Sequence, residues 1–211
     1  EECSRAGGVN GRQVELLVRD DAQNSERAIA AANELIALRV EGIVGPMTSA
    51  MAEVALPIAQ QAGIVLVSPT VTARKFFGLE DNLFLLMSST REEARLSADF
   101  HFNENGARRV AAIHDLKNRA YTESWLREFT VAFQGIGGEV FPVAYESGPD
   151  VSFGGIVQLV LSKQPDAVLM IASAADAARF AQKVRERNRR ILLFGSQWAA
   201  TERLVELGGH S

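Results

Sequence analysis

The sequence predicts an α/β protein built from two doubly wound lobes, each with a parallel sheet. Short β-branched or apolar runs alternate with segments of helical periodicity along the whole chain. Helical segments of roughly 10–15 residues separate successive strands, as the crossovers between parallel strands require. Both halves carry their own strand–helix series, which indicates two lobes.

The predicted strands are short runs with the length and composition of buried strands. They cover residues 13–19, 42–44, 64–68, 83–87, 109–114, 139–144, 167–171 and 191–194. The predicted helices carry an apolar face at helical spacing. They cover residues 24–38, 49–61, 90–105, 121–134, 152–161 and 174–186, and a last helix begins at 201–207.

Local signals mark several helix ends. Asn24 or Ser25 is the expected N-cap of the first helix. Thr90 and Glu93 form a Thr-x-x-Glu pattern, which is typical of a capping box at the start of a helix. Gly106 closes that helix, because glycine tolerates the left-handed backbone of a helix end.

We place the boundary between the lobes near Gly106. The first, N-terminal lobe then covers residues 1–105, and the second covers residues 106–211. No linker rich in Pro, Gly or Ser marks this point, so the boundary rests on the two strand–helix series alone.

Composition and charge exclude several classes of protein. The net charge of −4 argues against the basic stripe that nucleic-acid binding needs, so we expect no nucleic-acid partner. The basic run at 185–190 (RERNRR) fits the charged last turn and exit of a helix. No run of about eighteen apolar residues occurs, so we expect no membrane insertion in this segment. Cys3 is the only cysteine, which allows neither an intrachain disulfide nor a thiolate metal site.

The chain lacks the patterns typical of an enzyme, so we expect no catalysis, no metal and no cofactor. The glycine runs at 7–11 and 135–138 precede strands, whereas a phosphate or dinucleotide loop follows one. A G-x-S-x-G pattern is also missing. His114, at a strand end, is the best catalytic candidate, but no nucleophile or metal partner is evident. A hydrogen-bonding role at the strand end is the alternative.

Hydroxyl groups gather where strands of the first half end, and ligands of doubly wound folds bind at the carboxyl ends of strands. Ser49 lies at or next to the N-cap of the helix after strand 42–44. Its hydroxyl and the free amides of the first turn would make a carboxylate site. Thr70 and Thr72 follow strand 64–68. A plain N-cap and an ordinary polar turn are the alternative interpretations.

Aromatic residues follow strands of the second half. Tyr121 opens a helix after strand 109–114, and Trp198 lies in a loop after strand 191–194. Packing between the lobes is the alternative role for Trp198. Hydroxyls, a helix N-terminus and two rings without an acid–base pair indicate binding of a small polar or anionic molecule without its transformation.

A set of motifs in colinear order resembles the branched-chain amino-acid-binding family of periplasmic solute-binding proteins. The motifs are residues 7–12 (GGVNGR), 43–46 (IVGP) with Ser49, 63–69 (GIVLVSP), Tyr121, 165–168 (PDAV) and 195–198 (GSQW). The resemblance covers nearly the whole chain and implies the type I periplasmic binding fold. It also implies that a small carboxylate-bearing solute is bound in the periplasm, or outside the cell, for delivery to the membrane permease of an ABC transporter.

The resemblance further implies roles for single residues. Ser49 matches the serine that holds the ligand carboxylate, and Thr70 and Thr72 match contacts to the carboxylate and the amine. Tyr121 matches the aromatic residue that covers the ligand. The expected ligand-binding residues are those that match this pocket: Met47, Thr48, Ser49, Thr70, Val71, Thr72, Tyr121, Ser173, Gln197 and Trp198.

Two departures from the family bear on the ligand. Ser173 stands where the amino-acid binders have a tyrosine, and Gln197 stands where they have the acidic residue that neutralises the ligand ammonium. A buried ammonium needs a compensating charge or several acceptors. These departures therefore favour an organic or aromatic acid over a branched-chain amino acid.

The resemblance also implies that the first strand of the fold precedes Glu1 and that the return to the first lobe follows Ser211. Two other classes of protein stay open. One is the sensory ligand-binding domain of a membrane receptor or regulator with the same fold. The other is an α/β enzyme, which would need an acid–base or nucleophile cluster at the strand ends.

Overall fold

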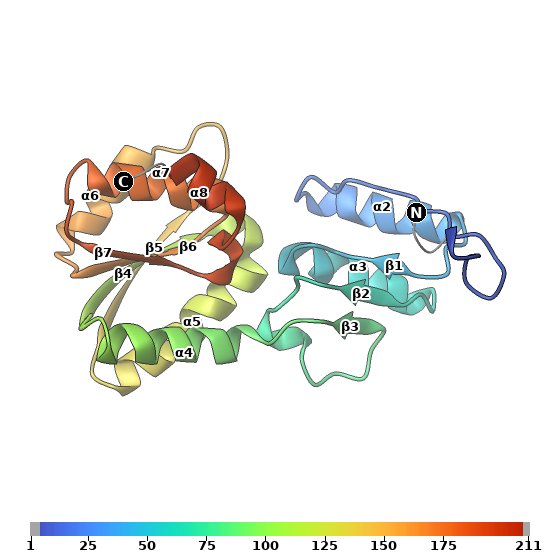
Figure 1. The fold of residues 1–211 in the computed structure, drawn as a ribbon, viewed down its shortest axis with the longest axis horizontal. Helices are drawn as coiled ribbons and strands as arrows, with labels where there is room; N and C mark the ends of the chain where they lie inside the picture. Colours follow the sequence, from blue (N-terminus) through green and yellow to red (C-terminus); the bar gives the residue numbers. More distant parts are fainter. Residues whose placement is uncertain (1–4, 209–211) are drawn as a thin grey trace.

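The structure, a computed structural model, describes residues 5–208 and contains two parallel sheets that lie side by side along the long axis (Figure 1). The first sheet has the order β1-β2-β3 and the second the order β5-β4-β6-β7, and every pairing is parallel. The strands are β1 (Ile43–Val44), β2 (Leu66–Ser68), β3 (Leu83–Leu85), β4 (Arg109–Asp115), β5 (Glu139–Tyr145), β6 (Ala167–Ile171) and β7 (Leu192–Gly195). The predicted fold class is confirmed.

The helices agree with the predicted ranges to within two residues at each end. They are α2 (Ser25–Ala37), α3 (Ser49–Gln61), α4 (Thr90–Asn103), α5 (Arg119–Gly135), α6 (Phe153–Ser162), α7 (Ala174–Arg185) and α8 (Glu202–Gly208). Three short 3-10 turns are η1 (Arg74–Phe76), η2 (Leu116–Asn118) and η3 (Gln197–Ala199). No helix within residues 5–208 is both long and apolar enough to cross a membrane.

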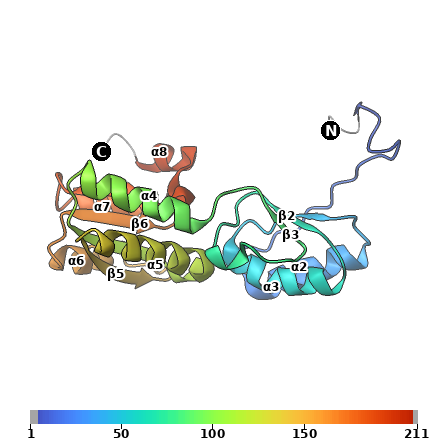
Figure 2. The ribbon, with the colours of Figure 1, turned by 90° about the horizontal axis from the view of Figure 1, so that it is seen from below.

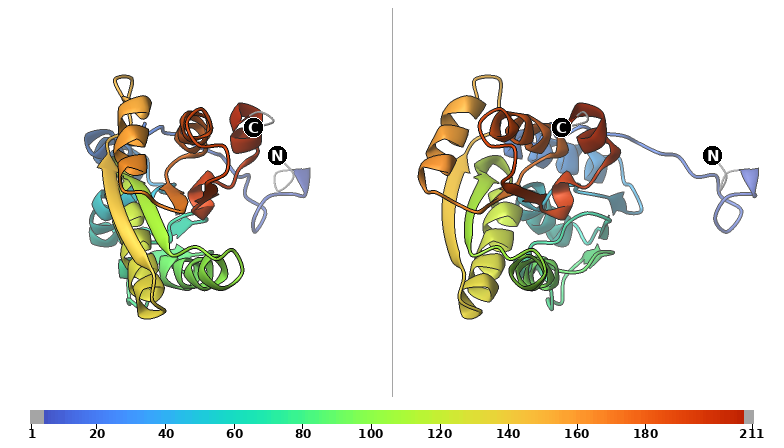
Figure 3. Two further views of the ribbon diagram at one scale, coloured as in Figure 1. Left: turned by 90° about the vertical axis from the view of Figure 1, so that its left-hand side faces the viewer. Right: turned by 60° about the vertical axis from the view of Figure 1, so that its left-hand side comes forward.

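The second sheet is covered by helices on both faces (Figure 3). Successive residues of a strand point to opposite faces, and β4 shows this directly. Ala111 and Ile113 pack in one core with α6 and α7, whereas Val110 and Ala112 pack in the other with α4 and α5. Burial on both faces explains why β4 and β6 are almost wholly apolar in sequence.

The predicted strand over residues 13–19 is not formed. This segment runs along α2 (Figure 1) with Leu16 and Val18 exposed by 79% and 72%. A cavity of about 1060 Å³ lies between the segment, α2 and the outer edge of β1. None of the strands described in residues 5–208 pairs with it. The strand prediction is therefore wrong for this structure, because a strand needs a hydrogen-bonded neighbour as well as the right residue pattern.

Helix α4 packs against the second sheet and not the first. Its small residues Ala94 and Ala98 lie in one core with Trp125 and Phe129 of α5. Because α4 lies with the second sheet, we propose a lobe boundary just before Thr90 in place of the one predicted near Gly106. Gly106 has a φ of +70° and ends the helix, so it is a helix C-terminal signal within the second lobe.

The capping box of α4 also differs from the predicted one by one residue. Ser89 is the N-cap, and its backbone N–H donates to Glu92 Oε2 at 3.1 Å. The predicted capping box of Thr90 and Glu93 is therefore not formed. The Thr90 hydroxyl instead pairs with the Ser124 hydroxyl at 2.8 Å, in the interior between α4 and α5.

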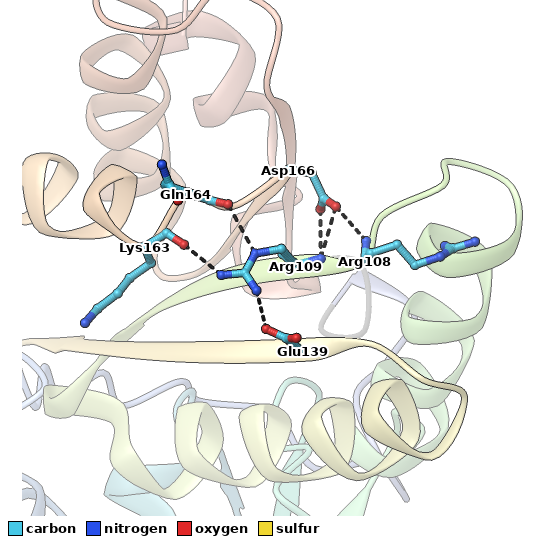
Figure 4. A network of polar contacts seen from close by, with 6 residues as sticks. All are labelled: Arg108, Arg109, Glu139, Lys163, Gln164 and Asp166. Carbon is cyan, nitrogen blue, oxygen red and sulfur yellow. Dashed lines mark hydrogen bonds and ion pairs between the residues drawn. The ribbon is translucent and has the colours of Figure 1, made fainter.

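A polar network fixes the amino end of the second sheet (Figure 4). The Asp166 carboxylate, in the turn before β6, accepts the backbone N–H groups of Arg108 and Arg109 at 2.9 and 3.0 Å. The Arg109 guanidinium donates to the carbonyl groups of Lys163 and Gln164 and pairs with Glu139. These contacts tie together the starts of β4, β5 and β6.

We predict that Asp166→Ala lowers the free energy of unfolding by about 1 kcal/mol, because two backbone donors lose a charged acceptor at a site that water can reach. For a chain of this size the melting temperature should fall by roughly 2–4 °C. Asp150→Ala, which removes an exposed acid in the loop after β5, is the control and should leave it nearly unchanged. Equal melting temperatures for both variants would show that Asp166 does not hold the strand starts.

Candidate ligand-binding site

The carboxyl ends of the two sheets are where the lobes meet. The Ala50 N–H, in the first turn of α3, donates to Asn118 Oδ1 of the second lobe at 3.2 Å. The Arg74 N–H donates to Ser124 Oγ at 3.1 Å. Figure 2 shows α3 and α5 approaching each other at this junction, and the two helices are in contact. Ligands of parallel α/β sheets bind at this edge, so the junction is the candidate site.

Ser49 links two loops of the first lobe. It is the first residue of α3, directly after the N-cap Thr48, whose side chain accepts the Met51 N–H. The Ser49 side chain is buried, and its Oγ accepts the backbone N–H groups of Thr72 and Ala73 at 3.4 and 3.3 Å. The hydroxyl proton stays available to donate to a carboxylate.

The other predicted residues of the first lobe lie close to one another. Thr70 is exposed and donates from Oγ1 to the Met47 carbonyl oxygen at 2.8 Å. The Thr72 carbonyl oxygen accepts the Thr90 N–H at 2.8 Å. Val71 is different, because its side chain is fully buried in the core of this lobe. A ligand would therefore meet Val71 only through its backbone.

In the second lobe two predicted aromatic residues are in contact. The ring of Tyr121 lies edge-on to Trp198, with the ring centroids 5.8 Å apart. Ser173 is the N-cap of α7, and its Oγ accepts the Asp176 N–H at 3.3 Å. Gln197 is exposed at the start of η3. Of the predicted ligand-binding residues, only Met47 lines the 1060 Å³ cavity beside β1. A cleft that the predicted residues of both lobes share therefore stays a prediction.

Glu93 and Ser196, which the sequence does not predict as site residues, lie near Tyr121. Within residues 5–208 no partner is found for Glu93 Oε2, whereas Glu93 Oε1 accepts the Ser88 hydroxyl at 3.4 Å. Burial raises the pKa of Tyr121. Hydrogen bonds with Ser196 and the Trp198 backbone lower this pKa, and the charge of the nearby Glu93 raises it. The Thr-x-x-Glu spacing predicts a capping role for Glu93, whereas the structure buries its Oε2 atom.

The other buried acids at this edge have partners. Asp115 Oδ1 accepts the N–H groups of Lys117 and Ser147, both at 3.0 Å. Asp176 Oδ2 accepts the Tyr145 hydroxyl at 3.0 Å. These carboxylates stabilise the turns at the ends of β4, β5 and β6.

His114 is buried at the end of β4, and burial lowers its pKa, which favours the neutral imidazole. In the described part of the chain its Nδ1 has no hydrogen-bond partner, so the predicted hydrogen bond is not found at this atom. No group of His, Cys, Asp and Glu side chains among residues 5–208 is arranged to hold a metal ion.

Two parallel α/β lobes that meet at the carboxyl ends of their strands have the architecture of a two-lobed binding protein. A family model described as periplasmic binding protein matches residues 1–210. The chain belongs to this family.

One relative and two solved structures illustrate the similarity. A Leu/Ile/Val-binding protein homolog from Brucella melitensis is 25% identical and covers 99% of this chain. The branched-chain amino acid substrate-binding protein LivJ from Streptococcus pneumoniae, in complex with isoleucine, has a TM-score of 0.86 at 22% identity and covers 98% of this chain. A solute-binding protein from R. palustris, in complex with benzoate, has a TM-score of 0.85 at 22% identity and covers 97%. The two structures establish the fold.

The chain spans only part of these proteins. It covers 56% of the Brucella relative, 59% of the isoleucine-binding structure and 57% of the benzoate-binding structure. What the whole protein binds and delivers is therefore a matter for proposal.

We predict that Ser49→Ala weakens the binding of a carboxylate ligand by about 1–3 kcal/mol, because a hydrogen bond to a charged group is lost. It should also lower stability, since the Thr72 and Ala73 amides lose their acceptor. Ser68→Ala is the matched control: it removes a buried hydroxyl that accepts the Val71 N–H but is not expected to touch the ligand. Calorimetry that finds unchanged affinity in Ser49→Ala would remove Ser49 from the site.

The stability of the protein should depend on pH through the half-buried carboxyl of Glu93. Burial raises the pKa of Glu93 to about 7, while the Ser88 hydroxyl lowers it and Glu92 raises it. The folded protein therefore holds a proton that the unfolded chain has lost above its ordinary value of 4.5. The unfolding free energy should fall as the pH rises from that value to about 7.

Glu93→Gln should remove this loss and melt higher than the parent at pH 8, but not at pH 4.5. After discounting for partial exposure we expect about 1 kcal/mol, or roughly 2–4 °C. Asp150→Asn, which removes an exposed acid in the loop after β5, is the control and should leave the melting temperature nearly unchanged at both pH values. An equal gain at both pH values in Glu93→Gln would show that the carboxyl is not buried in solution.

Proposed function

We propose that this chain is the ligand-recognising part of a solute-binding protein and not an enzyme. It binds a small carboxylate-bearing solute between its lobes and delivers it to the membrane permease of an ABC transporter. Membership of the periplasmic binding protein family over residues 1–210 supports this proposal and a periplasmic or extracellular location.

The main support for this proposal is the part of the site in the first lobe that suits a negatively charged group. Ser49 lies at the N-terminus of α3, at the junction between the lobes and next to the loop that holds Thr70 and Thr72. The expected free amides of the first turn are not available, because the Ala50 and Met51 N–H groups donate to Asn118 and Thr48. A helix N-terminus still favours negative charge, and the Ser49 hydroxyl proton can be donated to a carboxylate. The solute class we propose is therefore a branched-chain amino acid or a related organic or aromatic acid.

The names of similar proteins support this range of solutes. One similar structure contains isoleucine and another contains benzoate, and both solutes carry a carboxylate. Tyr121 and Trp198, in contact across the carboxyl end of the second sheet, provide an apolar wall for the body of either solute.

Closure of the lobes around the solute would be the signal to the permease. A ligand shifts a conformational equilibrium only if it binds one conformation better than the other. A solute held by Ser49 in one lobe and Tyr121 in the other would favour the closed arrangement. Hinge closure of two domains around a ligand is a common form of such switching.

We predict that leucine, isoleucine, valine, benzoate or another small carboxylate raises the melting temperature of the full-length protein. At a concentration of about a hundred times Kd the gain is about 2.7 kcal/mol, which corresponds to roughly 5–10 °C. Leucinol and benzyl alcohol, which lack the carboxylate, are the matched controls and should give no shift. If no carboxylate in the panel stabilises the protein, or if the alcohols do so equally, the proposed function is wrong.

A further inference from the structure

Helix α4 places two alanines against the core and two large apolar side chains on its outer face. Ala94 and Ala98 are fully buried in the second lobe, whereas Leu96 and Phe100 are 66% and 53% exposed. An ordinary surface helix has the opposite arrangement, with its large apolar residues toward the core and polar residues toward water. Packing within the lobe therefore does not explain why Leu96 and Phe100 are apolar.

Leu96 lines a groove between α4 and α5, which lie side by side (Figure 2). The groove has a volume of about 500 Å³, and Val131 of α5, which is 67% exposed, lines it from the other helix. Single exposed apolar residues are ordinary, but a continuous apolar patch with polar residues at its rim indicates an interaction site. We call this surface the α4–α5 groove and define it by Arg95, Leu96, Asp99, Val131, Ala132 and Ile136.

The charged residues of the α4–α5 groove are complementary to each other. Arg95 and Asp99 both line the groove, one turn apart on α4, and no ion pair among residues 5–208 involves either of them. Two copies of a helix that pack across a perpendicular two-fold axis run antiparallel. An axis at Ser97, midway between the two charges, would bring Arg95 of each copy opposite Asp99 of the other.

We propose that the α4–α5 groove is a two-fold interface between two copies of this protein. Leu96, Phe100 and Val131 would pack across the axis, and Arg95 of each copy would pair with Asp99 of the other. A two-fold interface uses the same patch twice, so a patch with an apolar centre and both charges at its rim can bind itself.

The position of the groove suits a binding protein with two lobes. Both of its helices pack on the second sheet, so the dimer would join two second lobes. Each first lobe would stay free to close on a solute. The proposal does not depend on which solute is bound.

The first test is sedimentation velocity on the full-length protein over a wide range of concentrations, where we expect a reversible dimer. Leu96→Asp should raise the dimer Kd by about 100-fold or more, because the two-fold axis places the new charge in the apolar centre twice. The side chain is mostly exposed, so this variant should melt at the temperature of the parent.

A charge exchange tests the proposed pairing. Arg95→Asp would set two carboxylates against each other on both sides of the axis and should raise the dimer Kd by about 10-fold or more. The double variant Arg95→Asp/Asp99→Arg restores both ion pairs, and its Kd should return to within about 3-fold of the parent. Arg27→Asp makes the same change of charge at an exposed position of α2; it is the matched control and should leave the Kd unchanged.

Three outcomes would overturn the proposal. One is a protein that stays monomeric at every concentration, which is also the result if the groove binds the permease or another part of the full-length chain. Another is a dimer that Leu96→Asp leaves intact. The third is a loss of dimer in Arg95→Asp that the double variant does not recover. Solute binding by Leu96→Asp should equal that of the parent, so the proposed function is tested separately from the dimer.

Discussion

A short chain of hydrogen bonds between the lobes positions everything else in the site. The Thr72 carbonyl oxygen accepts the Thr90 N–H, the Thr90 and Ser124 hydroxyls pair, and Ser124 Oγ also accepts the Arg74 N–H. All of the side-chain oxygens involved are buried, and each has its partners. Since one end of this chain is the loop that contacts Ser49 and the other is the helix that begins near Tyr121, it sets how the two halves of the site face each other.

The two halves differ in chemistry. The first lobe offers hydroxyls and a helix N-terminus, which suit an anion. The second offers two aromatic rings, Tyr121 and Trp198, which suit the apolar body of a solute. A solute that contacts both lobes would bind the closed arrangement better than the open one, and this difference in affinity is the physical requirement for a ligand to move the lobes.

Two local sequence patterns predict structures that the protein does not form. Residues 13–19 have the residue pattern of a strand, yet among residues 5–208 no strand pairs with them and a cavity separates them from β1. Thr90 and Glu93 have the spacing of a capping box, but Ser89 and Glu92 form it. In the first case the missing strand partner decided the outcome, whereas in the second an equivalent Ser-x-x-Glu pattern one residue earlier formed the cap.

The sequence alone determined the fold class, the order of strands and helices, and most of their bounds, because periodicity and helix capping act within a few residues. It also predicted Ser49, Thr72 and Tyr121 as residues at the carboxyl ends of strands, which is where they lie. Only the tertiary structure decided that α4 belongs to the second lobe and that Glu93 lies beside Tyr121. The reason is physical: burial and pairing depend on elements distant in sequence, and no local pattern encodes which face of α4 meets β7.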